Sequence, residues 1–420
     1  MSDDRVRLTR RRLLGGAGLV GTGVVLGAGG AYGVDRAAPR ETSGTSAEST
    51  VPFYGPRQAG ITTPQQSRLV FAAFDLTTSD VGAVKAMLGQ WSAAAALMTQ
   101  GKLIGPTEIR PEAPPFDTGE ALGIGPQRLT VTVGFGPSMF DERFGLGARR
   151  PAALAPLPEL PGDAVLDEQI SGGDICVQAC ADDPQVAFHV IRNFARIAAG
   201  TAMLRWSQVG FGRASATSRA QQTPRNLMGF KDGTNNIKVE DADSTSRFVW
   251  VGDETDQDWM RGGSYLVMRK IRMQIEAWDS DSLADQERVI GRTKEVGAPL
   301  SGRHEHDPLR LSRRDGHGDL VIPEHAHVSL ASPERNSGIQ LLRRGYNYAD
   351  GIDPTTGQID AGLFFLAYQK NAHEQFVPLQ RRLGADDLLN EYIKHVSSGL
   401  YACPGGVEKV GDWFGRRLFS

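Results

Sequence analysis

The stretch best suited to acid–base chemistry is residues 229–236, which read GFKDGTNN. An Asp-Gly pair followed by Thr and two Asn is typical of a tight polar turn. Such a turn would hold the carboxylate of Asp232 rigidly at the tip of a loop, where it could accept and return a proton. A plain surface turn shows the same residue types, so the spacing alone leaves both interpretations open.

A second stretch, residues 325–333 (HAHVSLASP), carries two histidines two positions apart. Its alternation predicts a strand, in which His325 and His327 would share one face. A histidine on a strand can bind a metal or a haem iron. A lone histidine is more often a hydrogen-bonded core residue, so this pattern also has a purely structural interpretation.

Two adjacent arginines lie in a third stretch, residues 341–348 (LLRRGYNY). On a strand, Arg343 and Arg344 point to opposite faces. One of them can then reach solvent, while the other points inward and needs an anionic partner. The hydrophobic run that follows at 363–369 (LFFLAYQ) predicts a core strand, and it could equally form a wall for a flat apolar cofactor.

These stretches together satisfy the requirements of a haem peroxidase. A ferric haem needs one axial ligand from the protein and an open opposite face. Cleaving the O–O bond of a bound peroxide then needs one acid–base group and one fixed positive charge. The second half of the chain supplies a histidine, an aspartate and an arginine for these three tasks.

The elements that would position these residues form two similar halves. The first half shows strands at 67–76, 127–134, 174–181 and 202–212, with helices at 79–99 and 184–199. This order, β-α-β-β-α-β, is that of a ferredoxin-like unit. The second half repeats it less regularly, with strands at 264–276, 325–330, 340–348, 363–369 and 399–403 and helices at 279–291, 374–384 and 385–397. We therefore predict an α+β fold of tandem ferredoxin-like halves with antiparallel sheets, of the dimeric α+β barrel type.

The first 36 residues resemble an export signal more than a folded element. Five arginines precede an uncharged run from Leu13 to Val34, which is a charged region followed by an apolar one. The segment TRRRLL at residues 9–14 resembles a twin-arginine signal, so we expect a partner in the twin-arginine translocase and a secreted, periplasmic or cell-surface location. Residues 37–66 predict a flexible linker, which leaves 67–225 as an N-terminal half and 226–420 as a C-terminal, haem-binding half.

Composition excludes other classes of protein. The 420 residues carry a formal net charge of −3, which gives no support to nucleic-acid binding. Three cysteines in an exported chain of this length are not a disulfide framework. Cys176 and Cys180 would lie about 13 Å apart on one face of a strand, too far for a disulfide, so we expect buried core residues there.

The chain resembles the dye-decolorizing peroxidases, within the exported bacterial branch that includes deferrochelatase-type proteins. The resemblance spans about residues 60–415. It is carried by GGDICVQACADDP (172–184), GFKDGTNN (229–236), HAHVSLASP (325–333), LLRRGYNY (341–348) and LFFLAYQKN (363–371). The combination is specific, although each stretch alone is not.

The resemblance implies a role for each matching residue. Asp232 matches the family's distal acid–base aspartate, and Gly233, Thr234 and Asn235 match the turn along the haem edge. His327, rather than His325, matches the proximal ligand of the haem iron. Arg344, rather than Arg343, matches the distal arginine, which stabilises developing negative charge and also contacts the haem.

The function implied is a haem b peroxidase that uses hydrogen peroxide to oxidise bulky organic electron donors, dye-like or phenolic, in one-electron steps. The family also implies a homo-oligomer. Two alternatives stay open. One is a deferrochelatase-type release of iron from haem in the same pocket, and the other is an extracytoplasmic metal-handling protein. The polar stretch at 303–307 (RHEHD) together with His317 has residue types that bind copper or zinc, although a solvated loop explains it as well.

Overall fold

The computed structural model describes residues 50–105 and 111–420, which belong to one compact unit. The predicted export signal at 1–36 and the start of the predicted linker lie outside the described residues. Among the residues that are described, no helix combines the length and the apolar character needed to cross a membrane.

The first half of the chain folds in the predicted β-α-β-β-α-β order. Its elements are β1 (Arg68–Leu76), α1 (Val81–Met98), β2 (Thr130–Phe135), β3 (Ile175–Ala181), α2 (Pro184–Ile197) and β4 (Ala202–Arg213). The strands are antiparallel and lie in the order β2-β3-β1-β4. Asp183 caps α2 by accepting hydrogen bonds from the first turn, and Pro184 follows at the position where it is best tolerated in a helix.

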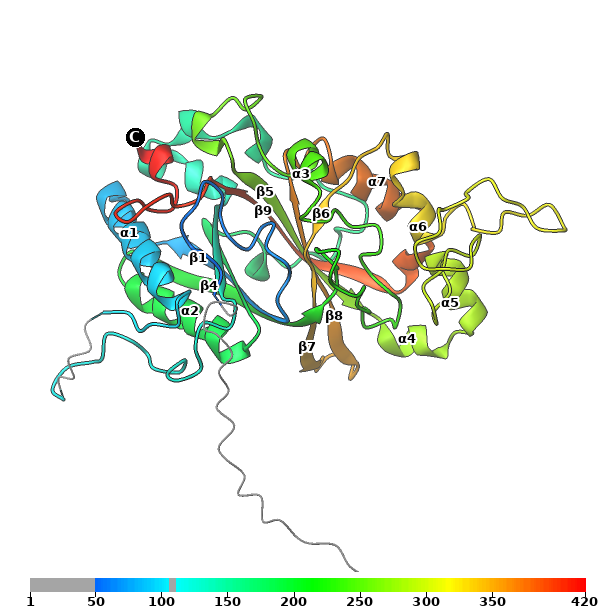
Figure 1. The fold of residues 1–420 in the computed structure, drawn as a ribbon, viewed down its shortest axis with the longest axis horizontal. Coiled ribbons are helices and arrows are strands. Elements are labelled where there is room, and N and C mark those ends of the chain that lie inside the picture. The colour runs from blue at the N-terminus through cyan, green and yellow to red at the C-terminus, as the bar shows by residue number, and fades with distance from the viewer. Residues whose placement is uncertain (1–49, 106–110) are drawn as a thin grey trace, which may run out of the picture. The chain divides into compact units, whose positions relative to one another are not determined.

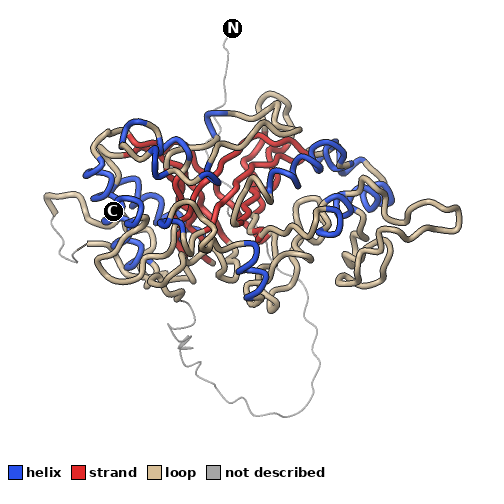
Figure 2. Tube along the Cα trace, turned by 90° about the horizontal axis from the view of Figure 1, so that it is seen from above, coloured by secondary structure: helices blue, strands red, loops and turns tan. Residues whose placement is uncertain are grey.

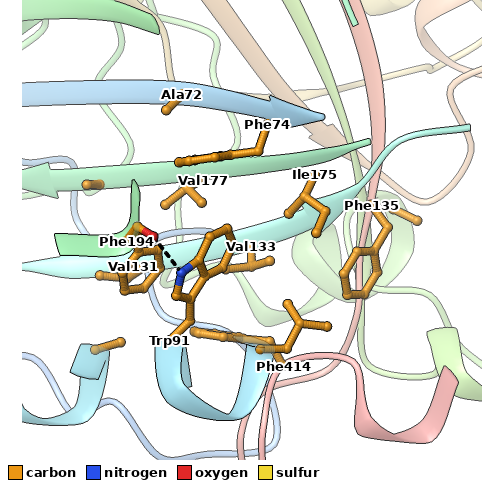
Figure 3. Packing of buried hydrophobic residues seen from close by; sticks show 14 of the residues in the cluster. Ala72, Phe74, Trp91, Val131, Val133, Phe135, Ile175, Val177, Phe194 and Phe414 are labelled. Atoms are coloured by element: carbon orange, nitrogen blue, oxygen red, sulfur yellow. Dashed lines mark hydrogen bonds between the residues drawn. The ribbon is translucent and has the colours of Figure 1, made fainter. Parts of the chain in front are cut away.

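Helices α1 and α2 cover the outer face of this sheet, and Trp91 of α1 lies at the centre of the contact (Figure 3). Its indole stacks on Phe194 of α2 with ring centroids 4.6 Å apart. The indole N–H donates to the carbonyl oxygen of Phe194 at 3.0 Å, so the buried tryptophan has no unmet polar group. This core packs the two helices of the first half onto its sheet.

The second half has the same topology with more insertions. Its elements are α3 (Ala242–Phe248), β5 (Ser264–Met273), α4 (Ile275–Ser280), α5 (Leu283–Ile290), α6 (His327–Leu330), β6 (Leu342–Arg343), β7 (Tyr346–Ile352), β8 (Ile359–Gln369), α7 (Phe376–Asp386) and β9 (Ile393–Cys403). The main strands lie in the order β9-β5-β8-β7, with the short β6 also paired to β8. Helices α4 to α7 lie on the outer side of this second sheet (Figure 1).

The two sheets join at both edges. Strand β4 pairs with β7, and β2 meets β9 where Phe135 faces Ala402. The strands therefore form a closed central layer with helices on either side (Figure 2). This is the predicted α+β arrangement of two ferredoxin-like halves.

The inner faces of the two sheets pack on each other. Residues from both halves form one buried cluster that includes all three cysteines and four tyrosines: Cys176, Cys180, Cys403, Tyr346, Tyr348, Tyr368 and Tyr401. The cysteines are free thiols, as predicted for small core residues.

Three sequence predictions about local structure were wrong. Residues 325–330 are not a strand: His327 begins the short helix α6, and short apolar runs do not distinguish a strand from a buried helical turn. Residues 385–397 are not helical throughout, because β9 begins at Ile393. The described part of the predicted linker, 50–66, is packed against the sheets, and Ile61, Gln65 and Gln66 are fully buried there. The side-chain amide of Gln65 donates to the carbonyl oxygen of Gly345, and that of Gln66 donates to Oγ1 of Thr130.

Candidate active site

A deep cavity lies in the second half, between the outer face of its sheet and helices α6 and α7. The sheet contributes apolar side chains from β5 and β8, and the helices contribute a second apolar wall on the opposite side. The lining residues include Ile271, Met273, Leu363 and Phe365 from the sheet, Val328, Leu379, Leu383 and Leu389 from the helical side, and the polar residues Asp232, Gly233, Thr234, Asn235, His327 and Arg343. Apolar walls with a few convergent polar groups are typical of a cofactor site.

The predicted acid–base turn lies at the cavity wall. The N–H of Asp232 donates to the carbonyl oxygen of Pro224 at 2.9 Å, which fixes the backbone there. Gly233 has φ of +94°, and a β carbon at this position would lie 2.7 Å from the nitrogen of Ala216. Only glycine fits such a position without strain, so the turn holds Asp232 in one place.

The carboxylate of Asp232 is bonded to Arg343. The Nη1 atom of Arg343 donates to Oδ1 of Asp232 at 2.6 Å, and both side chains are partly exposed to the cavity. The backbone of Arg343 is fixed by Asn236, whose amide donates to the Arg343 carbonyl at 2.8 Å and accepts from its N–H at 2.9 Å. The turn and strand β6 thus present an acid–base group and a fixed cation side by side.

Arg344, the arginine selected by resemblance, does not line the cavity. Its side chain is fully buried on the other face of the sheet, where it donates to Oε1 of Gln66 at 2.6 Å and to the carbonyl oxygen of Thr63. The distal arginine was expected at Arg344, but the residue that lines the cavity is Arg343. The reason is register: Arg343 pairs with Ala367 on β8, whose neighbour Phe365 on the same face lines the cavity.

His327 faces the same cavity from the first turn of α6. Its Nδ1 lies 2.7 Å from Oδ2 of Asp387, whose side chain is only 2% exposed. Burial opposes a charge on the imidazole, but the carboxylate of Asp387 outweighs it and raises the pKa of His327. Among the described hydrogen bonds, Nε2 of His327 has no partner, so this nitrogen remains available to a ligand in the cavity.

The other predicted histidine is separated from the site. His325 is exposed and does not line the cavity, and its carbonyl oxygen accepts from the N–H of Leu388. Sequence reasoning left the partner of His327 unidentified. Asp387 lies 60 positions further along the chain, and no spacing rule connects the two residues.

The donor set fits a haem. A histidine whose Nδ1–H is held by a buried carboxylate is the arrangement that orients an imidazole for binding a metal through Nε2. The apolar walls suit a porphyrin, and Arg343 lies at the wall opposite the helical side. Elsewhere in the described parts of the chain, no group of three or more His, Cys, Asp or Glu side chains could hold a metal ion, including the 303–307 stretch.

Comparisons with known proteins identify the family of the chain. The family model for the Dyp-type peroxidase N-terminal domain matches residues 58–212, and that for the C-terminal domain matches residues 223–408. The chain belongs to the Dyp-type peroxidase family, and it is accordingly a haem-dependent enzyme that uses hydrogen peroxide to oxidise organic donors.

Individual relatives are similar over nearly the whole chain. A deferrochelatase of Yersinia pseudotuberculosis is 37% identical, covering 100% of this chain and 96% of its own length. The deferrochelatase of Escherichia coli K12 is 37% identical, with 91% and 90% covered. The solved structure of DtpA from Streptomyces lividans, an oxyferrous/water mixed complex, is 41% identical with a TM-score of 0.81, covering 90% of this chain and 100% of that one.

Proposed function

We propose that His327, Asp232 and Arg343 are the working residues of this peroxidase and that its cofactor is haem b. His327 would bind the iron through Nε2, and Arg343 and the turn at Gly233, Thr234 and Asn235 would contact the haem. The observation that carries this assignment is that one cavity joins the His327–Asp387 pair to the Asp232–Arg343 pair.

When bound, the haem iron supplies the redox chemistry that cleaves the O–O bond. The residues of the chain manage the proton and the charge. The carboxylate of Asp232 accepts a proton from hydrogen peroxide and returns it to the departing oxygen, which leaves as water. The guanidinium of Arg343 stabilises the negative charge that develops on that oxygen. Asp387 would keep the proton of His327 on Nδ1 and so leave Nε2 free to bind the iron.

Two measurements on the purified protein test this function. The absorption spectrum should show a haem Soret band, and the band should be lost in His327→Ala. Addition of hydrogen peroxide and a phenolic donor should yield the oxidised donor. A protein that binds haem without peroxide-dependent oxidation would contradict the peroxidase assignment.

A second candidate function is the release of iron from haem with the porphyrin left intact. It is favoured by the similarity to deferrochelatases over the full chain. The same cavity would serve both reactions, so product analysis must separate them. Incubation with haem should give free protoporphyrin if iron release is the function, and it should give none if the protein is only a peroxidase.

We also propose that the protein is exported through the twin-arginine translocase, loaded with its cofactor, to a secreted, periplasmic or cell-surface location. The arginines at 10 and 11 within TRRRLL support this. Replacing both by lysine should retain the protein inside the cell, as cell fractionation would show. We expect a homo-oligomer, which size-exclusion chromatography with light scattering would measure.

A further inference from the structure

A short segment outside the sheet, residues 301–307, lies against the turn that carries Asp232, and we call it the strap. Its residue Glu305 has a side chain that is only 14% exposed. One carboxylate oxygen of Glu305 accepts from Oγ1 of Thr234 at 3.1 Å, and the other is paired with Nζ of Lys231. These two partners flank Asp232 and Gly233, so one carboxylate holds the turn on both sides.

The strap is itself fixed, which makes Glu305 a rigid anchor. Arg292 is 7% exposed, and its Nη1 donates to the carbonyl oxygen of Glu305 at 2.9 Å and to that of Gly297 at 2.7 Å. Within the strap, Oδ2 of Asp307 accepts from the N–H groups of Arg303 at 2.7 Å and His304 at 3.0 Å. The backbone at Glu305 is therefore held both by Arg292 and by the turn within the strap itself.

The charge of Glu305 is well compensated. Burial favours the neutral acid, but hydrogen bonds from Lys231, Thr223 and Thr234 outweigh burial and lower the pKa of Glu305. The group is therefore an ionised acceptor at neutral pH.

The contacts of Asp232 itself explain why such an anchor matters. Apart from the 2.6 Å bond to Arg343, its carboxylate has one described side-chain partner, the amide of Asn226, at 3.4 Å. The position of the carboxylate therefore depends on the turn more than on direct contacts. Within the described parts of the chain, Glu305 is the one carboxylate bonded to the side chains on both sides of Asp232 and Gly233.

We propose that Glu305 is a positioning residue for the proton transfer carried out by Asp232. This inference rests on the proposed role of Asp232 and extends it to the strap. It also gives the RHEHD stretch a function other than metal binding or a solvated loop. Displacing an acid–base group by about 1 Å can cost about 100-fold in rate, so loss of the Glu305 anchor should slow the peroxide reaction without removing it.

The test measures the second-order rate constant for hydrogen peroxide in haem-loaded variants by stopped-flow absorbance. Glu305→Ala should lower it about 10- to 100-fold. Glu305→Gln keeps an acceptor oxygen for Thr234, so it should restore part of the rate. Thr234→Val removes one of the two bonds without altering the strap, and it should give a smaller loss. Glu334→Ala is a matched control. Glu334 and Glu305 both line a second cavity, which shares Thr234 and Asn235 with the first, but Glu334 has no described bond to the turn.

A non-turnover measurement separates positioning from a general structural role. Hydrogen cyanide must give its proton to a distal base when it binds ferric haem, so its association rate should fall in parallel with the peroxide rate. Haem content and melting temperature should change little. If the melting temperature or haem content falls while both rates per haem are unchanged, Glu305 is only structural and the proposal is wrong.

The outcome for Asp232→Asn keeps this proposal distinct from the proposed function. If Asp232→Asn loses the peroxide reaction and Glu305→Ala does not, the strap has no positioning role. If Asp232→Asn keeps the peroxide rate, the acid–base assignment itself fails, and the positioning role fails with it.

Discussion

Arg343 and Asp232 form an ion pair at the wall of the cavity, with Nη1 of the arginine 2.6 Å from Oδ1 of the aspartate. The pair joins two separate pieces of chain, the GFKDGTNN turn and strand β6. Because Asn236 of the turn also bonds both backbone groups of Arg343, the two pieces cannot move independently. The arrangement places a proton acceptor and a positive charge within reach of one bound molecule.

The two neighbouring arginines should respond differently to substitution. Arg343→Met should lower the second-order rate constant for hydrogen peroxide about 100- to 1,000-fold, the usual cost of losing a group that stabilises developing charge. Stopped-flow absorbance of the haem-loaded protein measures this directly.

Arg344→Met is the matched control. It should leave that rate within about twofold but lower the free energy of unfolding by about 1–3 kcal/mol, because Gln66 and the carbonyl of Thr63 lose a buried donor. A large rate loss in Arg344→Met with no effect in Arg343→Met would restore the assignment that resemblance favoured.

Asp387 should control how tightly the haem is held. In Asp387→Asn, the imidazole of His327 loses its carboxylate partner at 2.7 Å. Replacing such a partner of a metal ligand typically costs about 10- to 100-fold in affinity, so haem should transfer faster to an excess of apomyoglobin. An unchanged transfer rate would show that the pair does not orient the ligand.

Gly233 should tolerate no side chain. An alanine there would need φ of +94° and would place its β carbon 2.7 Å from the backbone nitrogen of Ala216. Gly233→Ala should therefore displace the turn, lowering both the melting temperature and the peroxide rate. Gly316→Ala is a suitable control, since a β carbon there meets nothing within 4 Å. Equal behaviour of the two variants would contradict the geometry.

The stability of the first half should depend on pH through Asp174. Burial opposes the charge of this carboxylate, but hydrogen bonds from Arg143, Ser138 and the N–H of Leu76 outweigh it and lower the pKa of Asp174. A carboxyl whose pKa is lower in the folded state stabilises the fold above its unfolded pKa of about 3.9, and this contribution is lost as pH falls below that value. The melting temperature should thus fall on acidification through pH 4.

Asp174→Asn isolates this contribution from that of other carboxylates. At pH 7 the variant should be less stable than the wild type by about 1–3 kcal/mol, since Arg143 loses a charged partner that it binds through two bonds of 2.9 Å. The difference should shrink as the pH falls below about 4. A difference that is constant with pH would exclude the linkage.

The sequence predicted the strands and helices of the first half well, because its apolar segments are bounded by clear end signals. Asp183-Pro184 marks the start of α2, and the apolar run at 69–74 marks β1. The secondary structure of the second half was harder to predict. Around His327 the six residues 325–330 fit both a strand and a helical turn, and the packing of α6 against α5 and α7 accompanies the helical form.

For the site, residue types predicted the chemistry, while the exact residues needed the structure. Asp232 and His327 were selected from the sequence and lie on one cavity, but Arg343 and Arg344 differ only in the face of the sheet to which each side chain points. That choice depends on pairing with β8, far along the chain. The partners Asp387 and Glu305 lie 60 and 71 positions from His327 and Thr234, which they bind, so no local pattern could reveal them.

The most direct test of the proposed mechanism is the second-order rate constant for hydrogen peroxide in haem-loaded Asp232→Asn. The amide has nearly the shape of the carboxylate but cannot accept the proton. We expect the rate constant to fall about 100- to 10,000-fold, the usual contribution of an acid–base group, with the Soret band and haem content unchanged. A rate constant equal to that of the wild type would contradict the assignment of Asp232 as the acid–base residue.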